Sequence, residues 1–379
     1  MRKKKLIFIS NNLNFFITHR LLIAETALAK GFDVAIVYGE LGGADHEFLV
    51  HKGFKLIFIP MYRGAINIMK NFKTFFYLWI LIKKENPDIV HLISIKPYLY
   101  GGIISRLARV PAVVSAVSGM GSLFISKSFK SIFLRIILYP FYKLAFNHPN
   151  QTVIFHNKDD LKLFVDWGIL NPIKAKILKG SGVNLNNFKN FNDPKGITKV
   201  CLASRLLQDK GVYEYESAAK ILKDKGIIAD FYLAGDIDAK NPSTLSLEYV
   251  NKLKRENIVK VLGYQEDIAG LYAKSHIVCL PSYREGMPKS LLEAASAGRA
   301  IVTTDVPGCR DSIIPNKTGL IIPAKDSQKL ADAIKWLIDH PKERIAMGTA
   351  GRKLAEKEYA IENIVQNHLN IYEELLEEF

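Results

Sequence analysis

Cysteine is scarce in this chain, which argues against a disulfide-stabilised scaffold. Three cysteines occur in 379 residues, an odd number with no paired metal-ligand spacing. Cys201 and Cys279 lie in apolar runs typical of strands, which predicts packed free thiols in a reducing compartment. No cluster of histidine, cysteine and acidic residues indicates a metal site.

Long apolar runs are also missing, so no membrane-spanning helix is predicted. None reaches the roughly 18 residues that a span requires. The basic residues 1–5 and the apolar residues 6–9 resemble the start of a signal peptide, but residues 10–12 interrupt the apolar part early. We therefore expect a cytoplasmic protein.

A glycine-rich dinucleotide motif is absent from the start of the chain. Residues 6–10 predict a buried strand, and the polar loop at 11–15 contains no Gly-x-Gly-x-x-Gly. In nicotinamide enzymes that motif lets the backbone approach a pyrophosphate. A dinucleotide oxidoreductase is therefore disfavoured.

Acidic residues are absent from residues 122–146, a stretch rich in aromatic and aliphatic side chains. Lys127, Lys130, Arg135 and Lys143 interrupt it. This composition is typical of a helix that lies in a membrane surface, where each cation near anionic lipid contributes about 1 kcal/mol. The alternatives are a core helix with a basic outer face and a basic-aromatic RNA surface, although no RNA-binding motif accompanies the stretch.

The excess of basic charge is confined to one half of the chain. Residues 1–190 hold 26 Lys and Arg against 10 Asp and Glu, a net charge of +16. Residues 191–379 hold 26 against 27, a net charge of −1. The basic half favours an anionic partner, which could be nucleic acid, acidic lipid or a polyanionic substrate.

Short apolar strands alternate with helices along the whole chain, which predicts an α/β fold with doubly wound parallel sheets. The length suggests two domains, which we expect at 1–190 and 191–358. A linker rich in Asn, Phe and Lys is predicted at 186–195. The last helix, 359–379, has a glutamate-rich end that would complement the basic first half by packing back onto it.

A strand–loop–helix unit around Glu285 carries the strongest indication of function. Residues 277–280 predict a buried strand, and residues 289–297 predict a helix with Pro288 in its first turn. Ligands of open α/β sheets bind in the loop after a strand, and the helix start offers N–H groups to a phosphate. Glu285 could accept hydrogen bonds from sugar hydroxyls, and Glu293 could hold a ribose. The alternative is that both are solvated surface carboxylates.

A second pair of charges is predicted at the same edge of the sheet. Arg205 and Lys210 lie between a predicted strand at 199–203 and a predicted helix at 212–225. A guanidinium binds a diphosphate through two parallel hydrogen bonds, and an ammonium adds a point charge. The alternative is two solvated basic positions.

Glycines follow two further predicted strands. Gly119 and Gly121 permit either a backbone nest for an anion or an ordinary turn. Gly235 permits close approach of a ligand. The Asp-Ile-Asp that follows Gly235 resembles the metal motif of another nucleotide-sugar enzyme class, but we favour a turn there.

Together these motifs resemble those of a known family. Arg205 with Lys210, and Glu285 with Glu293 inside the run 281–294, are similar to the donor-site motifs of retaining family-4 glycosyltransferases of the GT-B fold. The resemblance covers the whole chain. Within the family the chain is most similar to bacterial transferases that build N-glycans or O-antigens on undecaprenyl diphosphate, including N-acetylgalactosaminyltransferases. The segments that carry this narrower resemblance are 119–124, 234–236, 241–243 and 246–248.

The resemblance implies two Rossmann-like domains facing a cleft, with a UDP-sugar bound to the second. Arg205 and Lys210 would neutralise the donor diphosphate, Glu285 would contact the donor sugar and Glu293 the ribose. The transfer would retain the anomeric configuration and need no essential metal or cofactor. The further implied donor contacts are Gly235, Tyr264, Gln265, Gly286, Met287, Lys289 and Ser290.

The resemblance also implies the partners: a UDP-sugar, a polyprenyl-diphosphate-linked acceptor and the anionic inner face of the cell inner membrane, but no nucleic acid. The acceptor contacts are the least defined, because the first loop lacks the usual glycine pair and residues 115–118 lack the usual histidine. Pro288 also stands where many relatives have glycine. Gly119, Gly121 and His19 remain as acceptor candidates, and a packed structural histidine is the alternative for His19.

Two other classes of function stay open. Nucleotide-sugar epimerases share the GT-B fold, although their acid–base histidine pattern is not found in this chain. A nucleic-acid-binding protein is supported by the charge alone.

Overall fold

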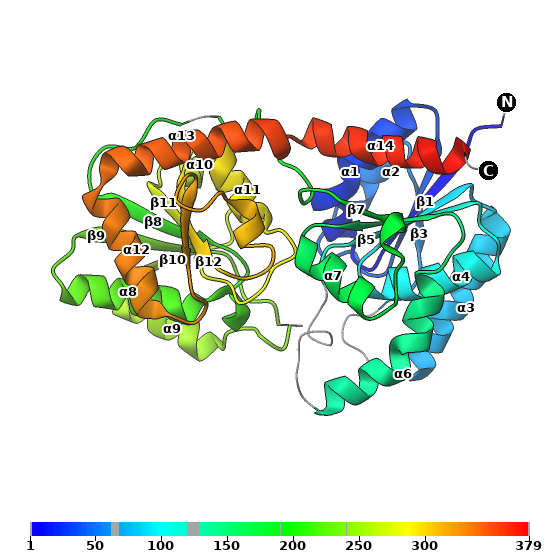
Figure 1. The fold of residues 1–379 in the computed structure, drawn as a ribbon, viewed down its shortest axis with the longest axis horizontal. Coiled ribbons are helices and arrows are strands. Elements are labelled where there is room, and N and C mark those ends of the chain that lie inside the picture. The colour runs from blue at the N-terminus through cyan, green and yellow to red at the C-terminus, as the bar shows by residue number, and fades with distance from the viewer. Residues whose placement is uncertain (1, 62–67, 120–128, 190, 240, 378–379) are drawn as a thin grey trace. The chain divides into compact units, whose positions relative to one another are not determined.

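The structure is a computed structural model that describes residues 2–61, 68–119, 129–189, 191–239 and 241–377 (Figure 1). The chain forms two compact units. One comprises residues 1–181 together with 364–379, and the other comprises residues 182–363. Each unit is built around its own parallel β-sheet.

The first unit contains a seven-stranded parallel sheet. Its strands are β1 Lys5–Ser10, β2 Asp33–Tyr38, β3 Lys55–Phe58, β4 Ile89–Ile93, β5 Ala112–Val117, β6 Gln151–Phe155 and β7 Ala175–Ile177. They are arranged in the order β3-β2-β1-β4-β5-β6-β7, so the direction of winding reverses between β1 and β4. The central strands are buried on both faces and are apolar except for His91 on β4 and Ser115 on β5.

Helices connect these strands, as a doubly wound sheet requires. They are α1 Leu13–Ala29, α2 His46–His51, α3 Ile68–Glu85, the π-helical turn Pro97–Gly101, α4 Gly102–Leu107, α6 Phe129–Ala145 and α7 Lys158–Asp166. Residues 11–15 are not the polar loop that the sequence predicts. The side chain of Asn12 accepts a hydrogen bond from the N–H of Phe15, so α1 begins at Leu13, directly after this N-cap.

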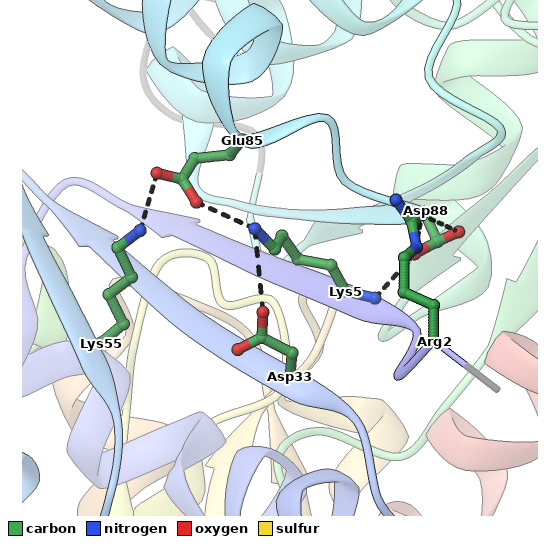
Figure 2. Close-up of polar contacts among 6 residues, drawn as sticks. All are labelled: Arg2, Lys5, Asp33, Lys55, Glu85 and Asp88. Atoms are coloured by element: carbon green, nitrogen blue, oxygen red, sulfur yellow. Dashed lines mark hydrogen bonds and ion pairs between the residues drawn. The ribbon is translucent and has the colours of Figure 1, made fainter.

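The amino-terminal edge of this sheet is held by ion pairs (Figure 2). The carboxylate of Glu85 lies 2.7 Å from the ammonium of Lys55 and 3.1 Å from that of Lys5, and the hydrogen bond from Lys55 lowers the pKa of Glu85. Asp88 accepts hydrogen bonds from the guanidinium of Arg2 at 3.0 Å. Part of the basic charge at the start of the chain is therefore paired with carboxylates of the same unit.

The second unit contains a six-stranded parallel sheet. Its strands are β8 Thr198–Ala203, β9 Ala229–Ala234, β10 Val259–Gly263, β11 Ile277–Leu280, β12 Ala300–Thr304 and β13 Gly319–Ile322. The order is β10-β9-β8-β11-β12-β13, so β8 and β11 are neighbours although they are far apart in the sequence. The helices are α8 Val212–Asp224, α9 Leu247–Glu256, α10 Ile268–Ala273, α11 Lys289–Ser296, α12 Ser327–Asp339 and α13 Pro341–Glu358.

The predicted linker at 186–195 is fixed to the second unit rather than free. Arg299 is buried and donates a hydrogen bond to the carbonyl oxygen of Asn192 at 3.0 Å. The guanidinium of Arg344 lies 2.8 Å from the carboxylate of Asp193. These side chains come from elements more than a hundred residues away, so the composition of residues 186–195 alone could not reveal the contacts.

The last helix, α14 Ile361–Glu377, packs on the first unit from Ile364 onward. The hydroxyl of its buried Tyr372 lies 2.6 Å from Nδ1 of His91 on β4. At its surface, the carboxylate of Glu373 lies 3.4 Å from the ammonium of Lys30. The glutamate-rich end therefore meets basic residues of the first unit, the arrangement expected from the charge pattern.

A buried cluster of basic side chains lies where α14 meets α1. Arg20, His156 and His368 are all buried, and a guanidinium nitrogen of Arg20 lies 3.4 Å from Nε2 of His156. Burial lowers the pKa of Arg20 to about 10, of His156 to about 4 and of His368 to about 3. Both histidines are therefore neutral in the folded protein near pH 7.

Candidate functional site

The loop after β11 carries the central carboxylate of the site. Strand β11 is fully apolar and buried, and it ends before Pro281, which has no N–H for the ladder. The backbone N–H of Glu285 then donates to the carbonyl oxygen of Pro307 at 3.1 Å. Pro288 is the N-cap of α11, one position before the first turn in which the sequence placed it. The loop is therefore held at both ends.

Glu285 is held by two side chains. The ammonium of Lys210 forms an ion pair with its Oε1 atom, and the hydroxyl of Ser282 donates to the same atom at 2.6 Å. Only 12% of the Glu285 side chain is exposed, so it is not the solvated loop charge of the alternative interpretation. The carboxylate is consequently fixed beside a cation at the carboxyl edge of the sheet.

Gly211 allows the loop that carries Lys210 to pack against the loop that carries Glu285. Lys210 ends a 3-10 turn, Gln208–Lys210, and Gly211 follows it in the left-handed conformation with φ +73°. A Cβ atom at Gly211 would lie 2.1 Å from the carbonyl oxygen of Pro281. The two loops can approach this closely only because the position has no side chain.

Arg205 lies in the same loop as Lys210 but is more exposed. Its guanidinium lies 2.6 Å from the carboxylate of Asp238, and 53% of its side chain is accessible. The loop after β9 that holds Asp238 begins at Gly235, where a Cβ atom would lie 1.8 Å from the carbonyl oxygen of Ser204. The absence of a side chain at Gly235 thus lets the two backbone segments pack together. This packing explains why a glycine stands here, without any need for a ligand to approach it.

Glu293 lies on the inner side of α11. Burial raises the pKa of its carboxyl group, while the ammonium of Lys289 at 3.5 Å acts in the opposite direction. The carbonyl oxygen of Ser290 accepts a hydrogen bond from the buried Tyr272 at 3.2 Å, which fixes the first turn of the helix. Gly286 and Met287 lie between Glu285 and this turn.

The structure does not gather all of the predicted residues around Glu285. Tyr264 and Gln265 follow β10, at the far edge of the sheet order from β11, and Tyr264 is exposed. His19 belongs to the first unit, where its Nδ1 lies 2.9 Å from the hydroxyl of Ser181. Gly119 follows β5, whereas Gly121 lies outside the described residues.

Sequence reasoning missed two residues that shape the site. Ser282 is buried, and its hydroxyl also donates to the carbonyl oxygen of Asp209 at 2.8 Å, so it joins both loops. Gly308 packs against the backbone of Glu285. A serine three positions before a glutamate and a glycine in a distant loop give no signal without the folded arrangement. Within the described part of the chain, no group of three or more His, Cys, Asp or Glu residues could hold a metal ion.

Comparisons with known proteins agree with this geometry. Residues 184–354 match the family model described as glycosyl transferases group 1, and residues 5–157 match the model described as glycosyl transferase 4-like. A curated relative from Campylobacter jejuni is 33% identical over 340 residues, which cover 86% of this chain and 87% of the relative. The chain belongs to this glycosyltransferase family. The resemblance predicted from the donor motifs is confirmed.

The relatives act in bacterial glycan synthesis according to their names. The Campylobacter jejuni relative is N,N'-diacetylbacillosaminyl-diphospho-undecaprenol alpha-1,3-N-acetylgalactosaminyltransferase. An Escherichia coli relative, UDP-Gal:alpha-D-GlcNAc-diphosphoundecaprenol alpha-1,3-galactosyltransferase, is 28% identical over 81% of this chain and 80% of its own length. These names support a glycosyltransferase over the nucleotide-sugar epimerase.

A solved structure confirms the GT-B fold of this glycosyltransferase. Sucrose-phosphate synthase from Thermosynechococcus elongatus superposes with a TM-score of 0.80, covering 100% of both chains at 17% sequence identity. At this identity the similarity concerns the fold. The prediction of two doubly wound parallel sheets is confirmed by the seven-stranded and six-stranded sheets.

Proposed function

We propose that this glycosyltransferase moves a hexose, with N-acetylgalactosamine as the first candidate, from a UDP-sugar to a saccharide linked to a polyprenyl diphosphate. The observation that carries the proposal is the fixed contact between Lys210 and Glu285, supported by Ser282, at the carboxyl edge of the second sheet. It sets a cation and a carboxylate side by side, as a donor with a diphosphate and a sugar requires. The names of the two curated relatives supply the acceptor class.

The two cations fit the donor diphosphate. Lys210 presents an ammonium from the loop after β8, and the exposed guanidinium of Arg205 lies in the same loop. When the bond between the anomeric carbon and the UDP oxygen breaks, negative charge develops on the leaving phosphate. Positive groups fixed at that place stabilise the transition state more than the ground state.

The carboxylates fit the sugars of the donor. Glu285 would accept hydrogen bonds from the hydroxyls of the transferred sugar, because Ser282 and Lys210 hold its carboxylate in a fixed orientation. Glu293 would accept hydrogen bonds from the ribose, and the N–H groups at the start of α11 would face a phosphate. The loop residues Gly286 and Met287 would line the donor, and Tyr264 and Gln265 would lie toward its base.

The reaction would proceed with retention at the anomeric carbon. The acceptor hydroxyl oxygen bonds to that carbon on the face from which UDP departs, and the leaving phosphate takes the hydroxyl proton. No protein group is then needed as a base, and no essential metal or other cofactor is proposed, because Arg205 and Lys210 supply the positive charge. The first unit would hold the acceptor, with Gly119 and His19 as candidate contacts.

The proposed place of action is the anionic inner face of the cell inner membrane, where a polyprenyl-linked acceptor resides. None of the helices in the described ranges has the length and apolar character that crossing a bilayer requires. We therefore propose a peripheral enzyme. The basic charge of residues 1–190 would serve lipid and diphosphate rather than nucleic acid.

The test is a panel of UDP- and GDP-sugars offered with lipid-linked saccharide extracted from membranes, with release of the nucleoside diphosphate as the readout. Release from one UDP-sugar, dependent on the acceptor and unaffected by a metal chelator, supports the proposal and names the donor. Nucleoside diphosphate release that requires a divalent metal would contradict the proposal that the reaction needs no essential metal. Conversion of a UDP-sugar to its epimer without an acceptor would overturn the transferase reaction.

A further inference from the structure

Helix α6 exposes an apolar face. Phe129 is 86% accessible and Ile136 is 67% accessible, and Ile132, Phe133, Ile137 and Phe141 are also exposed. Their spacing of three and four residues places them on one side of the helix. A contiguous apolar surface of this kind marks an interaction site in an otherwise water-soluble protein.

Helix α3 exposes a second apolar stripe. Met69 is 72% accessible, Phe72 is 70% accessible, and Phe76 and Ile80 are also exposed. They recur at intervals of three, four and four residues, so they lie in one line along the helix. The opposite side, which includes Leu78 and Ile82, is buried.

The two helices cover the same part of the first unit. Both pack against α4 and against the π-helical turn Pro97–Gly101 (Figure 1). The ring of Phe75 on α3 contacts the ring of Tyr100 in this turn, with centroids 6.2 Å apart. Their outer faces are therefore built on one common support.

Cations accompany both stripes, and acidic groups do not. The basic residues of α3 and α6 whose side chains the structure describes are Lys70, Lys73, Lys83, Lys84, Arg135 and Lys143. The acidic residue of these helices is Glu85, at the end of α3, and its carboxylate is engaged by Lys5 and Lys55. The combined surface is therefore apolar and cationic.

We propose that α3 and α6 together form one docking surface for an anionic lipid bilayer. This inference deepens the proposed function, on which it rests for the membrane-bound acceptor. The apolar side chains would enter the boundary between headgroups and acyl chains, and the lysines would contact the headgroup phosphates. The stripe on α3 runs from Met69 to Ile80 and that on α6 from Phe129 to Phe141, which is about 16 to 18 Å at 1.5 Å per residue step, so both lie in the membrane plane rather than cross a core of about 30 Å.

Charge distinguishes the lipid from a second copy of the chain. In a twofold symmetric dimer each helix would meet the same surface, so the lysines would face lysines. Like charges opposed across an interface oppose association, whereas an anionic lipid neutralises each of them. The surface thus fits lipid better than it fits itself.

The test is co-flotation of the full chain with vesicles of phosphatidylcholine alone and with vesicles containing phosphatidylglycerol. We expect binding only to the anionic vesicles. The variant pairs F72S/F76S on α3 and F133S/I136S on α6 should each weaken it about tenfold or more, since each removes two inserted apolar side chains. K73E/K84E should weaken it in low salt more than in high salt.

The matched control is I173S/I228S, which removes two isoleucines outside these helices that are even more exposed than the residues changed in the test variants. It should bind vesicles as the wild type does, and circular dichroism and thermal melts should show all variants folded. If F72S/F76S binds anionic vesicles as strongly as the wild type does, α3 is not part of the docking surface. A concentration-dependent dimer that F72S/F76S abolishes, without vesicle binding by the wild type, would replace the lipid with a second copy.

A second readout separates this inference from the proposed function. UDP release to a short-chain, water-soluble acceptor should be unchanged in F72S/F76S, because α3 is outside the donor site. Vesicle binding without UDP release from any donor would leave the docking surface standing while the transferase proposal fails. UDP release without vesicle binding by the wild type would support the transferase proposal and overturn the docking surface.

Discussion

A Cβ atom at Gly308 would lie 2.5 Å from the carbonyl oxygen of Glu285 and 2.6 Å from that of Gly286. The glycine in the loop after β12 therefore sets the path of the loop that carries the candidate catalytic carboxylate. A side chain there would push the Glu285 backbone away from Ser282 and Lys210.

We predict that Gly308→Ala lowers turnover by at least tenfold, because displacement of a catalytic group by about 1 Å can cost up to a hundredfold. The control is Gly196→Ala, which also puts a side chain at a positive φ but meets no atom within 4 Å. The positive φ alone should cost each variant roughly 1 to 2 kcal/mol of unfolding free energy, and the backbone collision should add to this loss in Gly308→Ala. Equal turnover in the two variants would contradict the role of Gly308.

Glu285→Gln should keep the fold and lose turnover by about 10²- to 10³-fold, the range for removal of one fixed electrostatic group from a transition state. The amide keeps the size of the side chain but removes the charge that Lys210 contacts. Glu248→Gln, at an exposed position of α9, is the control. Steady-state UDP release checks the prediction, and turnover near that of the wild type would remove Glu285 from the mechanism.

Ser282→Ala should lower turnover about 10- to 100-fold, because a hydrogen bond to a charged group contributes about 1.5 to 3 kcal/mol. It should change kcat more than KM, since Ser282 orients Glu285 from a buried position. The control is Ser296→Ala on α11, which removes a buried hydroxyl that donates to the carbonyl oxygen of Leu292 at 2.8 Å. Its effect should fall on stability rather than on turnover.

Acid should destabilise the fold through the buried histidines under α14. The pKa of His156 is about 4 and that of His368 about 3 in the folded protein, against an ordinary value near 6.5 in the unfolded chain. Below pH 6.5 the unfolded chain takes up protons that the folded protein cannot, so unfolding free energy falls as the pH drops toward 4. It should be constant, as far as these two groups are concerned, above pH 7.

Denaturant unfolding at pH 7.5, 6 and 5 checks this dependence. His368→Gln should have a shallower loss of unfolding free energy between pH 6.5 and 5 than the wild type, because one of the linked protons is gone while His156 and His91, whose pKa burial also lowers, remain. His340→Gln, in the turn before α13, is the control and should keep the wild-type slope. An identical slope in His368→Gln would contradict the assignment.

The elements that the sequence predicted best are continuous apolar runs with polar ends. The strand predicted at 277–280 has the observed boundaries, and those predicted at 6–10 and 199–203 begin one residue inside β1 and β8, because a strand buried on both faces has no other favourable position. The start of α1 was missed because Asn-rich residues obscure Leu13, the first buried residue of the helix.

The sequence predicts at which edge of the second sheet the site lies. Lys210 and Glu285 each follow a strand, and parallel strands end at one edge, so their proximity could be expected from the sequence. The contact itself depends on β8 and β11 being neighbours and on Gly211 closing the gap, which no local pattern reveals. Ser282 acts on Glu285 through its side-chain hydroxyl and Gly308 through close backbone packing, and both contacts exist only in the folded chain, so they could not be found.

The packing of α14 has a consequence for the order in which the protein folds during synthesis. The first unit lacks this helix until the ribosome has made the second unit, residues 182–363. At about 5 to 20 residues per second, that delay is roughly 10 to 40 seconds. Until then His91 on β4 and Phe32 after α1 lack the contact that Tyr372 makes with each of them. The amino-terminal half of the chain therefore completes its core last, although it is translated first.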